Sequence, residues 1–402
     1  MNRERLTRDQ EHWQGIARRL ASDVLAPRAA AIDREGTFPR QNFAAFAQAG
    51  LLGLPVGEEL GGPGADVLTT TIVTEALAQG CASSALCYHM HIAATTFIVA
   101  AAEGDQIDRF VLPILRGEHI STYAISEPGS GSRWWHMESF VEPDGAGGYV
   151  YDGYKSFATS AGHCDSYVVP TRASPTSPHN EFTILLIDRT IEGVEPVGVW
   201  DAMGMRGNSS TPVRFNRCRV PATHRLGEAA FGFPLLMAHG LPVFQIGLAA
   251  VYLGLAQSAL DFAIAHVTKR VHADTGLPLA KVETVQRYVA EMAIRIDRTR
   301  SFVYRVARYV QEMIDEHEDL VEFVEDEGFL QSIAQVKVSA CEAAQEVTHM
   351  AVQVCGGQGY GRGYPMERYY RDARAGSIMG PNDDMLKNLI GQRALGLPYP
   401  WE

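Results

Sequence analysis

The spacing of apolar residues changes twice along the chain. Up to about residue 117 the apolar positions follow helical periods, as in the run Trp13, Ile16, Leu20 and Val24. Between about 120 and 220 they form short runs rich in β-branched and aromatic residues, separated by Gly and Pro turns. After Gly232 long helical periods return. The pattern therefore predicts a helical part, a strand-rich part and a second helical part.

Individual elements follow from the same pattern. We expect helices near residues 13–25, 43–49, 66–79 and 83–102, with Asp66 as the N-cap of the third and Pro27 unsuited to a helix interior. Four strands are expected at 149–157, 166–171, 182–187 and 211–220, and three long helices at 248–269, 282–317 and 327–355. Gly356 and Gly357 would end the last helix.

This order of elements predicts an α+β protein that is mainly α. We expect an N-terminal α-helical domain over residues 1–119, a small antiparallel β domain over 120–228, and a C-terminal helical bundle over 229–402. The length of the chain is sufficient for two or three domains with a sizeable core.

Composition and charge narrow the class of protein. The chain has 402 residues, 46% of them hydrophobic, and a formal net charge of −12. This negative charge argues against non-specific nucleic-acid binding. The six cysteines form no C-x-x-C pair and no zinc-type cluster with His, so we expect reduced thiols, a cytoplasmic location and no metal site.

One stretch is apolar enough to raise the question of a membrane span. The first residues, MNRERLTRDQEHW, are charged and contain no apolar signal core. Residues 246–265 are strongly apolar, but Gln257, Ser258 and Asp261 interrupt them, and polar groups are costly in lipid. We therefore predict a helix at the centre of a soluble bundle and no contact with a membrane.

A glycine-rich segment marks the start of the strand-rich part. It reads Tyr123-Ala-Ile-Ser-Glu-Pro-Gly-Ser-Gly-Ser132. Glycine lets backbone N–H groups approach an anion, because it has no side chain in the way. Taken alone, the segment is equally typical of an ordinary turn.

A second motif lies in the first long predicted strand. Residues 151–160 read YDGYKSFATS, and alternation along a strand directs Phe157 and Thr159 to the same face. Taken alone, this motif is compatible with a strand that carries ordinary core aromatics.

Two further motifs lie in the second helical part. Residues 255–261 read LAQSALD, with Lys269 and Arg270 shortly after them, and residues 353–372 read QVCGGQGYGRGYPMERYYRD. In this order, the four motifs resemble those of the acyl-CoA dehydrogenase family, and the resemblance extends over nearly the whole chain. It implies the three-domain fold of that family and an FAD cofactor.

The resemblance assigns flavin-binding positions. It implies that Ser126 hydrogen-bonds the flavin ring, that Phe157 covers one face of the ring, and that Thr159 reaches its reactive edge. Arg270 and Gln353 would reach the FAD of a neighbouring subunit, so we expect a homo-oligomer, either a dimer or a tetramer. Further expected cofactor-binding residues are Tyr123, Ile125, Gly131, Ser132, Gly356, Gly357, Asn382 and Asp384.

One departure from the family pattern concerns the catalytic base. The family usually has a Glu where this chain has Gly380, counted from Arg371 and Asp372. Some members carry the base early in the helix of the LAQ motif, where this chain has Phe244 and Gln245. None of these three residues can accept a proton, and a general base typically contributes about 10²–10⁴-fold.

Two pairs of side chains are candidate replacements for the base. Asp383 and Asp384 follow Gly380 by about one helical turn, although they also suit the capping of a helix N-terminus. The resemblance places His89 and His91 in the helix that lines the acyl pocket, and a packing role explains each histidine equally well.

The same resemblance indicates which residues form the substrate pocket. A histidine at its closed end predicts a polar or ring-bearing acyl group, because an unpaired imidazole is costly to bury beside a plain fatty chain. The expected pocket residues are His89, Ser132, Phe244, Gln245 and Gly380.

Three functions remain open at this point. The first is an FAD-dependent oxidoreductase that acts on an acyl thioester of CoA or of a carrier protein, with a non-standard or relocated base and an electron-transfer flavoprotein as partner. The second is a reduced-flavin-dependent monooxygenase on the same scaffold, supplied by a flavin reductase, which needs a dry cavity and no carboxylate. The third is a non-catalytic flavin-binding subunit of a hetero-oligomer.

Overall fold

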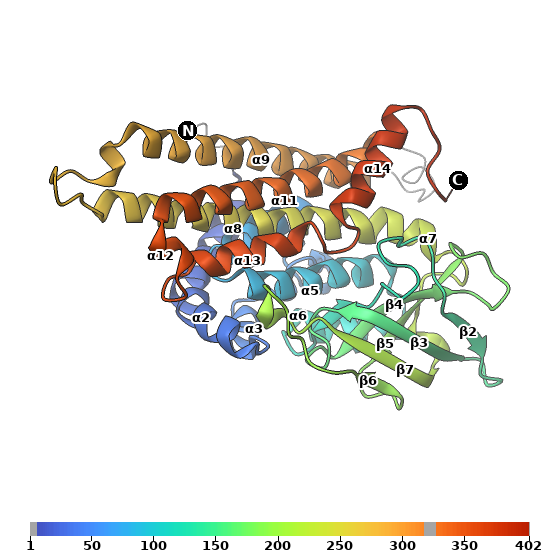
Figure 1. Ribbon diagram of the computed structural model, residues 1–402. Helices are drawn as coiled ribbons and strands as arrows, with labels where there is room; N and C mark the ends of the chain where they lie inside the picture. Colours follow the sequence, from blue (N-terminus) through green and yellow to red (C-terminus); the bar gives the residue numbers. More distant parts are fainter. Residues whose placement is uncertain (1–5, 317–326, 402) are drawn as a thin grey trace.

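Among the residues that the structure describes, two helical regions pack together, and the one sheet lies beside them at one side of the molecule (Figure 1). This is a computed structural model, and it describes residues 6–316 and 327–401. Helices come first, strands second and long helices last along the chain. The predicted class, α+β with mainly helical structure, is confirmed.

Two of the N-terminal helices begin at side chains that cap them. Thr7 Oγ1 accepts a hydrogen bond from the Gln10 N–H at 3.2 Å, and the Gln10 side chain accepts one from the Thr7 N–H at 3.1 Å. Asp66 Oδ1 accepts one from the Thr69 N–H at 2.6 Å, as predicted for this N-cap. The elements are α1 (Arg8–Leu20), η1 (Ala21–Leu25), α2 (Ala26–Glu35), α3 (Arg40–Gln48), η2 (Glu58–Leu60), α4 (Val67–Ala78), α5 (Ala82–Ala101), η3 (Ile107–Val111) and α6 (Leu112–Leu115).

Helical backbone continues past Pro27, where the sequence suggested a break. The π-helical turn η1 separates α1 from α2, and Pro27 lies in the first turn of α2. A proline is tolerated there because a first-turn N–H has no partner within its own helix. Gly36, with φ of +64°, then ends α2 in the left-handed conformation.

The middle part of the chain forms one sheet of eight strands. Its order is β6-β7-β3-β2-β4-β5-β8, with β1 paired to β4. Most pairs are antiparallel as predicted, but β1 and β2 each run parallel to β4, because long connections bring these strands to it. The strands are β1 (Ser121–Tyr123), β2 (Phe140–Pro143), β3 (Tyr149–Ala158), β4 (Ser166–Arg172), β5 (Phe182–Asp188), β6 (Val194–Pro196), β7 (Thr211–Val220) and β8 (Arg225–Leu226), with the short turns η4 (Arg206–Asn208) and η5 (Ala222–His224).

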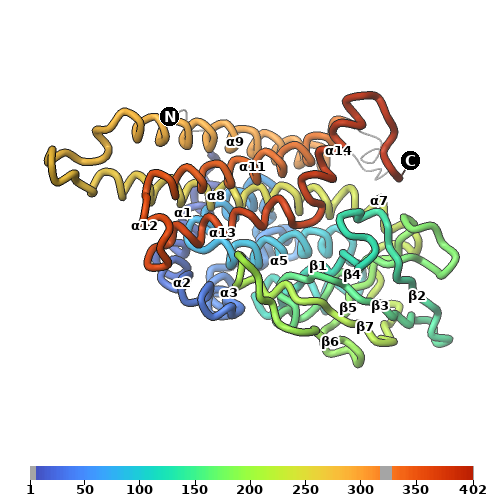
Figure 2. The backbone as a smooth tube through the Cα atoms, viewed as in Figure 1, coloured from blue at the N-terminus to red at the C-terminus, as the bar shows by residue number. Residues whose placement is uncertain are grey.

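The C-terminal part is a bundle of long helices. Its elements are α7 (Gly232–Leu235), η6 (Leu236–Gly240), α8 (Leu241–Lys269), η7 (Leu279–Lys281), α9 (Glu283–Glu316), α11 (Glu327–Cys355), α12 (Gly357–Tyr360), α13 (Met366–Gly376) and α14 (Asp383–Ala394). Figure 2 shows α8, α9 and α11 side by side, with α5 and α13 nearer to the sheet.

The two most apolar helical stretches are buried within this fold. The helix α5 and the helical run 232–269 are long and apolar enough to cross a membrane, but 83% and 89% of their most apolar windows are buried by the protein itself. A helix that is apolar on all sides is typical of a protein core. This agrees with the prediction of a core helix for residues 246–265.

Candidate functional site

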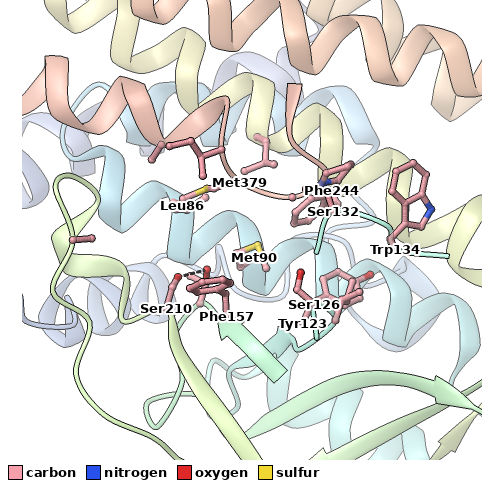
Figure 3. Close-up of a pocket in the computed structure, with 18 of the residues that line it drawn as sticks. Leu86, Met90, Tyr123, Ser126, Ser132, Trp134, Phe157, Ser210, Phe244 and Met379 are labelled. Carbon is pink, nitrogen blue, oxygen red and sulfur yellow. Dashed lines mark hydrogen bonds between the residues drawn. The ribbon is translucent and has the colours of Figure 1, made fainter. Parts of the chain in front are cut away.

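A cavity of about 510 Å³ lies between the sheet and the helices (Figure 3). Its walls come from α5, the segment after β1, the end of β3, the loop before β7, the start of α8, and α13 with the segment that follows it. This volume is in the range of small-molecule and cofactor sites. Nine residues that the sequence placed in the flavin or substrate site line it: Tyr123, Ile125, Ser126, Gly131, Ser132, Phe157, Thr159, Phe244 and Gly380.

Two hydroxyl groups and an open backbone position meet in one part of the cavity. A Cβ atom built on Gly380 would lie 3.8 Å from Ser126 Oγ and 3.9 Å from Ser132 Oγ. These are ordinary contact distances, so a side chain at Gly380 would point into free space beside both hydroxyls. The Asn382 N–H donates to Ser132 Oγ at 3.2 Å and joins the two walls.

Gly131 supplies a second open position. Its φ of +55° is in the left-handed region, and no atom lies within 4 Å of a Cβ built there. Other residues rarely adopt this backbone conformation, whereas glycine adopts it readily. This leaves open space beside the turn, although the Gly131 N–H donates to Glu127 O at 3.3 Å and the Arg133 N–H donates to Ser130 O at 3.0 Å.

The end of β3 contributes an aromatic face and a hydroxyl. Phe157 is 62% exposed although it is a large apolar side chain, and it lies over the cavity. Thr159 Oγ1 is hydrogen-bonded to Ser210 Oγ at 2.8 Å (Figure 3). An exposed ring beside a pair of hydroxyls suits a planar ligand with polar atoms at its edge.

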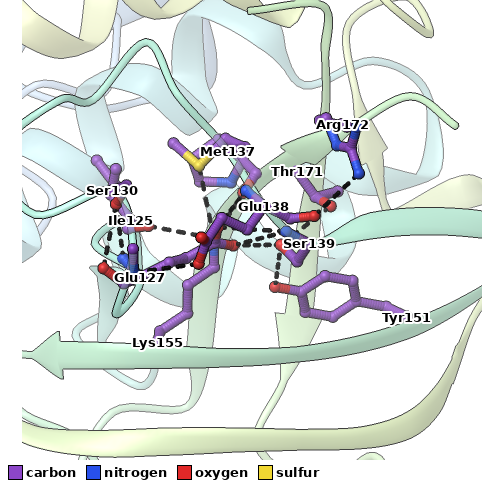
Figure 4. A network of polar contacts seen from close by, with 12 residues as sticks. Ile125, Glu127, Ser130, Met137, Glu138, Ser139, Tyr151, Lys155, Thr171 and Arg172 are labelled. Atoms are coloured by element: carbon purple, nitrogen blue, oxygen red, sulfur yellow. Dashed lines mark hydrogen bonds and ion pairs between the residues drawn. The ribbon is translucent and has the colours of Figure 1, made fainter. Parts of the chain in front are cut away.

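A buried ion pair lies behind the segment that carries Ser126 (Figure 4). The side chains of Lys155 and Glu127 are 0% and 2% exposed, and the Lys155 ammonium lies 2.9 Å from Glu127 Oε1. Glu127 also accepts hydrogen bonds from the Ser139 side chain and from the Ser139 N–H. Burial raises the pKa of Glu127, but the charge of Lys155 and these hydrogen bonds outweigh it and hold the pKa below its ordinary value. Glu127 is therefore an ionised structural carboxylate that does not line the cavity.

The cavity contains no group that is a usual general base. Among its lining residues within the described ranges, none is Asp, Glu, His, Lys or Cys. Tyr123 does line it, but burial raises the pKa of its phenol well above the ordinary value, and the hydroxyl donates to Ala93 O at 3.2 Å. The four candidate replacement bases must therefore be located elsewhere.

The prediction that His89 lines the pocket is contradicted by the structure. Leu86 and Met90 face the cavity from α5, whereas His89 faces α8. Its Nε2 is 2.9 Å from Phe244 O, and a Cβ added at Gly247 would overlap the imidazole ring. Burial lowers the pKa of His89 to about 4, so the ring is neutral near pH 7. The predicted polar or ring-bearing acyl group loses its basis with this placement.

His91 is also a packing residue. Its Nδ1 accepts a hydrogen bond from the Ser121 N–H at 3.1 Å, so Nε2 carries the proton and donates it to Leu52 O at 3.0 Å. Burial lowers the pKa of His91 to about 4. The imidazole therefore ties α5 to β1 and has no access to the cavity.

The two aspartates belong to the start of α14. Asp383 is buried and forms an ion pair of 2.8 Å with Lys337, while Asp384 is exposed. Asn382 caps the helix by accepting from the Met385 N–H at 2.8 Å. Neither aspartate lines the cavity, nor does Asn382, which meets it only through its backbone N–H on Ser132.

Gln245 lies behind the cavity wall. It borders a separate void of about 20 Å³, and Trp134 and Leu241 separate this void from the main cavity. Gln245 is 1% exposed, and its Oε1 has no hydrogen-bond partner among the described residues. Its predicted place in the substrate pocket is therefore contradicted by the structure.

The residues predicted to reach a neighbouring subunit are far from this chain's own cavity. Arg270 follows α8, and Gln353, Gly356 and Gly357 lie at the junction of α11 and α12, at the end of the bundle away from the sheet (Figure 1). All four are exposed. Their contact with another subunit's FAD stays a prediction.

Sequence reasoning missed several walls of the cavity. The loop before β7 has no recognisable motif, and α5 is apolar on nearly every side, so neither indicated which residues face a ligand. The helix α13 carries the Arg-Asp pair used for counting, yet its own contribution to the wall was not predicted. The missed residues include Leu86, Met90, Trp200, Met203, Ser210, Arg371, Arg374 and Ala375.

Comparisons with known proteins agree with this arrangement. Models of the acyl-CoA dehydrogenase N-terminal, middle and C-terminal domains match residues 7–118, 122–218 and 231–395. The chain is 29% identical to an acryloyl-CoA reductase (NADH) of Anaerotignum propionicum, over 97% of this chain and 95% of the relative. It is 31% identical to the human mitochondrial short-chain specific acyl-CoA dehydrogenase, over 94% of this chain and 88% of the relative.

A solved structure shows the same fold. Butyryl-CoA dehydrogenase from Megasphaera elsdenii superposes with a TM-score of 0.89 at 27% identity, covering 98% of this chain and 99% of that chain. The predicted resemblance is confirmed by both the sequence and the fold. The chain belongs to the acyl-CoA dehydrogenase family of flavin-dependent oxidoreductases.

Proposed function

We propose that this protein oxidises or reduces an acyl thioester, carried by CoA or by a carrier protein, without a side-chain base of its own in the cavity. One observation carries the proposal. Gly380 lies beside Ser126 and Ser132 in a cavity whose described lining contains no carboxylate, imidazole, thiol or amine. Membership of the family indicates the class of reaction. Gly380, which has no side chain, indicates that this protein lacks the family's usual base.

FAD is the cofactor of this family, and the cavity residues fit it. The exposed ring of Phe157 would cover one face of the flavin, and Ser126 and Thr159 would hydrogen-bond its polar edge. The open turn at Gly131 would leave room for a diphosphate beside backbone N–H groups. When bound, FAD exchanges a hydride equivalent with the substrate.

The chain's own residues would then orient the substrate and exclude water. Hydroxyl donors in an apolar cavity polarise a thioester carbonyl more strongly than they would in water. A proton that leaves the carbon beside the carbonyl has no carboxylate to receive it, and such a base typically contributes about 10²–10⁴-fold. We therefore expect plain straight-chain acyl-CoAs to be poor substrates.

The same observation supports a second candidate function. A reduced-flavin-dependent monooxygenase needs a dry cavity and no base beside the substrate. The walls of this cavity are largely apolar, with Leu86, Met90, Phe244 and Leu248 among them. In this case a flavin reductase would take the place of an electron-transfer flavoprotein as partner.

Location and assembly complete the proposal. We place the protein in the cytoplasm, because all six of its cysteines are free and buried, as is usual in a reducing compartment. We propose a dimer or a tetramer in which Arg270 and Gln353 of one subunit complete the FAD site of another. Both residues are exposed and distant from their own cavity, which is compatible with such an exchange.

The test compares two ways of supplying electrons. The purified protein is loaded with FAD and mixed without oxygen with a panel of acyl thioesters, while the flavin absorbance is recorded. Bleaching by one of them supports the first function. A product formed only with a flavin reductase and O₂ supports the second. Failure to take up FAD, or inertness in both assays unless a partner chain is added, would contradict the proposal and favour a non-catalytic subunit.

A further inference from the structure

Two lysines of the described chain have no exposed surface, and both lie behind walls of the cavity. Lys155 is on β3 and Lys337 is on α11, and the side chain of each is 0% exposed. Burying an ammonium group is unfavourable unless it is paired and its donors are satisfied. The partners that satisfy these donors therefore indicate what each lysine holds in place.

Lys155 holds the segment on both sides of Ser126. Its ammonium donates to Ile125 O at 3.2 Å and to Glu127 Oε1 at 2.9 Å, and its third bond goes to Pro170 O at 2.8 Å on β4 (Figure 4). Ser126 lies between the first two partners, and its own carbonyl accepts from the Ser156 N–H at 2.8 Å.

Lys337 holds the segment on both sides of Gly380 in the same way. Its ammonium donates to Met379 O at 3.3 Å and to Pro381 O at 3.1 Å, and it pairs with Asp383 Oδ1 at 2.8 Å. Each lysine thus makes three hydrogen bonds. Two of them go to groups on either side of one cavity residue, and the third goes to a further partner.

The two segments lie next to one another in one part of the cavity. A Cβ on Gly380 would lie 3.8 Å from Ser126 Oγ, so the main-chain positions fix how far the hydroxyl stands from the place of the usual base. We propose that Lys155 and Lys337 act as a pair of positioning residues that set this spacing. Neither side chain touches the ligand space, so their effect passes through the backbone. We call each lysine with its three partners a clamp. The clamps are independent of the proposed function, whereas the importance of the spacing for turnover rests on it.

The experiment compares three buried ion pairs. Lys155→Met and Lys337→Met remove the two clamps, and Arg300→Met is the control because Arg300 pairs with the buried Glu75 at 2.9 Å between α9 and α4, away from the cavity. Amide hydrogen exchange is measured over residues 125–127 and 379–383, together with the FAD dissociation constant and the visible flavin spectrum.

We expect faster exchange in segment 125–127 for Lys155→Met and in segment 379–383 for Lys337→Met. Each variant should also raise the FAD dissociation constant about tenfold, which corresponds to about 1.4 kcal/mol of binding free energy. Each should shift the flavin absorbance band as well. Arg300→Met should lower stability without changing either segment or the spectrum. Unchanged local exchange in both lysine variants would overturn the proposal.

Double variants keep the test decisive if the single variants do not fold. Lys155→Met with Glu127→Leu, and Lys337→Met with Asp383→Leu, leave no buried charge unpaired, and replacement of a whole buried pair is often tolerated. These folded variants should show the same local exchange changes, and native-like exchange in them would overturn the proposal. The exchange readout needs no FAD, so it is independent of whether the wild type reacts with a thioester.

Discussion

Gly380 lines the cavity at the position that we propose for the family's base, and the space around it is open. The two nearest side-chain atoms to a Cβ added there are the hydroxyl oxygens of Ser126 and Ser132, at 3.8 and 3.9 Å. No neighbouring side chain fills the space beside Gly380. A side chain introduced at this position should point toward the ligand and away from the protein core.

This geometry predicts that Gly380→Glu gains activity toward straight-chain acyl-CoAs. A general base is worth about 10²–10⁴-fold, and we expect a gain of at least tenfold in kcat/KM because the geometry is not optimised. The measurement is the rate of flavin bleaching by butyryl-CoA without oxygen. Gly380→Gln is the matched control, since it has the same size and cannot accept the proton. Equal rates in the two variants would show that the carboxylate does not act as a base.

Gln245 allows a second prediction at the scale of one residue. Its buried Oε1 has no partner among the described residues, and an unsatisfied buried polar group costs about 1–3 kcal/mol. Gln245→Met keeps the shape and removes the polar atoms, so we expect the free energy of unfolding to rise by about 1 kcal/mol or more. Denaturant titration measures this change.

A second buried glutamine provides the control for this prediction. Gln106 donates to Thr223 O at 2.8 Å and to Arg225 O at 2.7 Å, so Gln106→Met should lower the free energy of unfolding. If Gln245→Met is as destabilising as Gln106→Met, the Gln245 amide must be satisfied by a water or a ligand in the adjoining void.

The buried carboxyl group of Asp372 should make the stability of the protein depend on pH. Burial raises its pKa to about 7 from an ordinary 3.8, and the hydrogen bond from the Met205 N–H only partly opposes this. Between these two pH values the folded protein holds a proton that the unfolded chain has lost. The free energy of unfolding should therefore fall as pH rises from about 4 to 7 and change no further above 7 through this group.

The variant Asp372→Asn tests this contribution. The amide oxygen can still accept from the Met205 N–H, while the proton exchange is removed, so the fall in stability between pH 5 and about 7 should be smaller than in the wild type. Unfolding free energies at several pH values give the comparison. Parallel curves for the two proteins would mean that Asp372 is already ionised at pH 5 in the folded state.

At the scale of elements, the helix α5 shows which structural features the sequence could predict and which it could not. Its residues are apolar on almost every side, so the helix could be predicted but not the face it turns to the cavity. The alignment placed His89 in the pocket wall, whereas Leu86 and Met90 form that wall and His89 contacts α8. Side-chain direction depends on the packing partner, which lies far away in the sequence.

Strands and loops differ in how well the sequence predicts which of their residues line the cavity. Alternation along the strand predicted a common face for Phe157 and Thr159, and both line the cavity, although β3 ends at Ala158. The loop before β7 carries Trp200 and Met203 to the cavity, where the Trp200 ring lies 6.4 Å from the Phe157 ring, but the loop's sequence has no periodicity and no motif. Motif positions could therefore be predicted, while walls supplied by irregular segments could not.

The contact between α5 and α8 leads to a prediction for His89. His89→Leu removes the hydrogen bond to Phe244 O, and we expect the free energy of unfolding to fall by about 1–3 kcal/mol. The preference among acyl thioesters should stay unchanged, since His89 does not line the cavity. Met90→Ala, one position further along, enlarges the cavity and should change that preference. A selectivity change in His89→Leu with none in Met90→Ala would contradict the packing described above.

At the scale of the whole molecule, the end of the bundle away from the sheet carries exposed apolar side chains. Tyr360 is 84% exposed, Tyr364 42% and Tyr370 46%, on and around α12 and α13. Exposed aromatic side chains are enriched at protein–protein interfaces. Gln353 lies in the same region, which supports the proposal that this end covers another subunit's FAD.

Shared sites predict complementation between two defective chains. Arg270→Glu should impair the FAD site of a neighbouring subunit, and Ser132→Arg should fill the chain's own cavity; each homo-oligomer should therefore bind FAD at least tenfold more weakly than the wild type. Co-expression of the two variants creates some sites in which the Ser132 cavity and the Arg270 of the neighbour are both intact. The measurement is FAD bound per chain in the purified mixed oligomer, together with its mass by light scattering. Recovery of up to half of the sites in a mixed dimer would support the shared site, whereas a monomeric wild type, or a mixture with no more FAD than either variant alone, would rule it out.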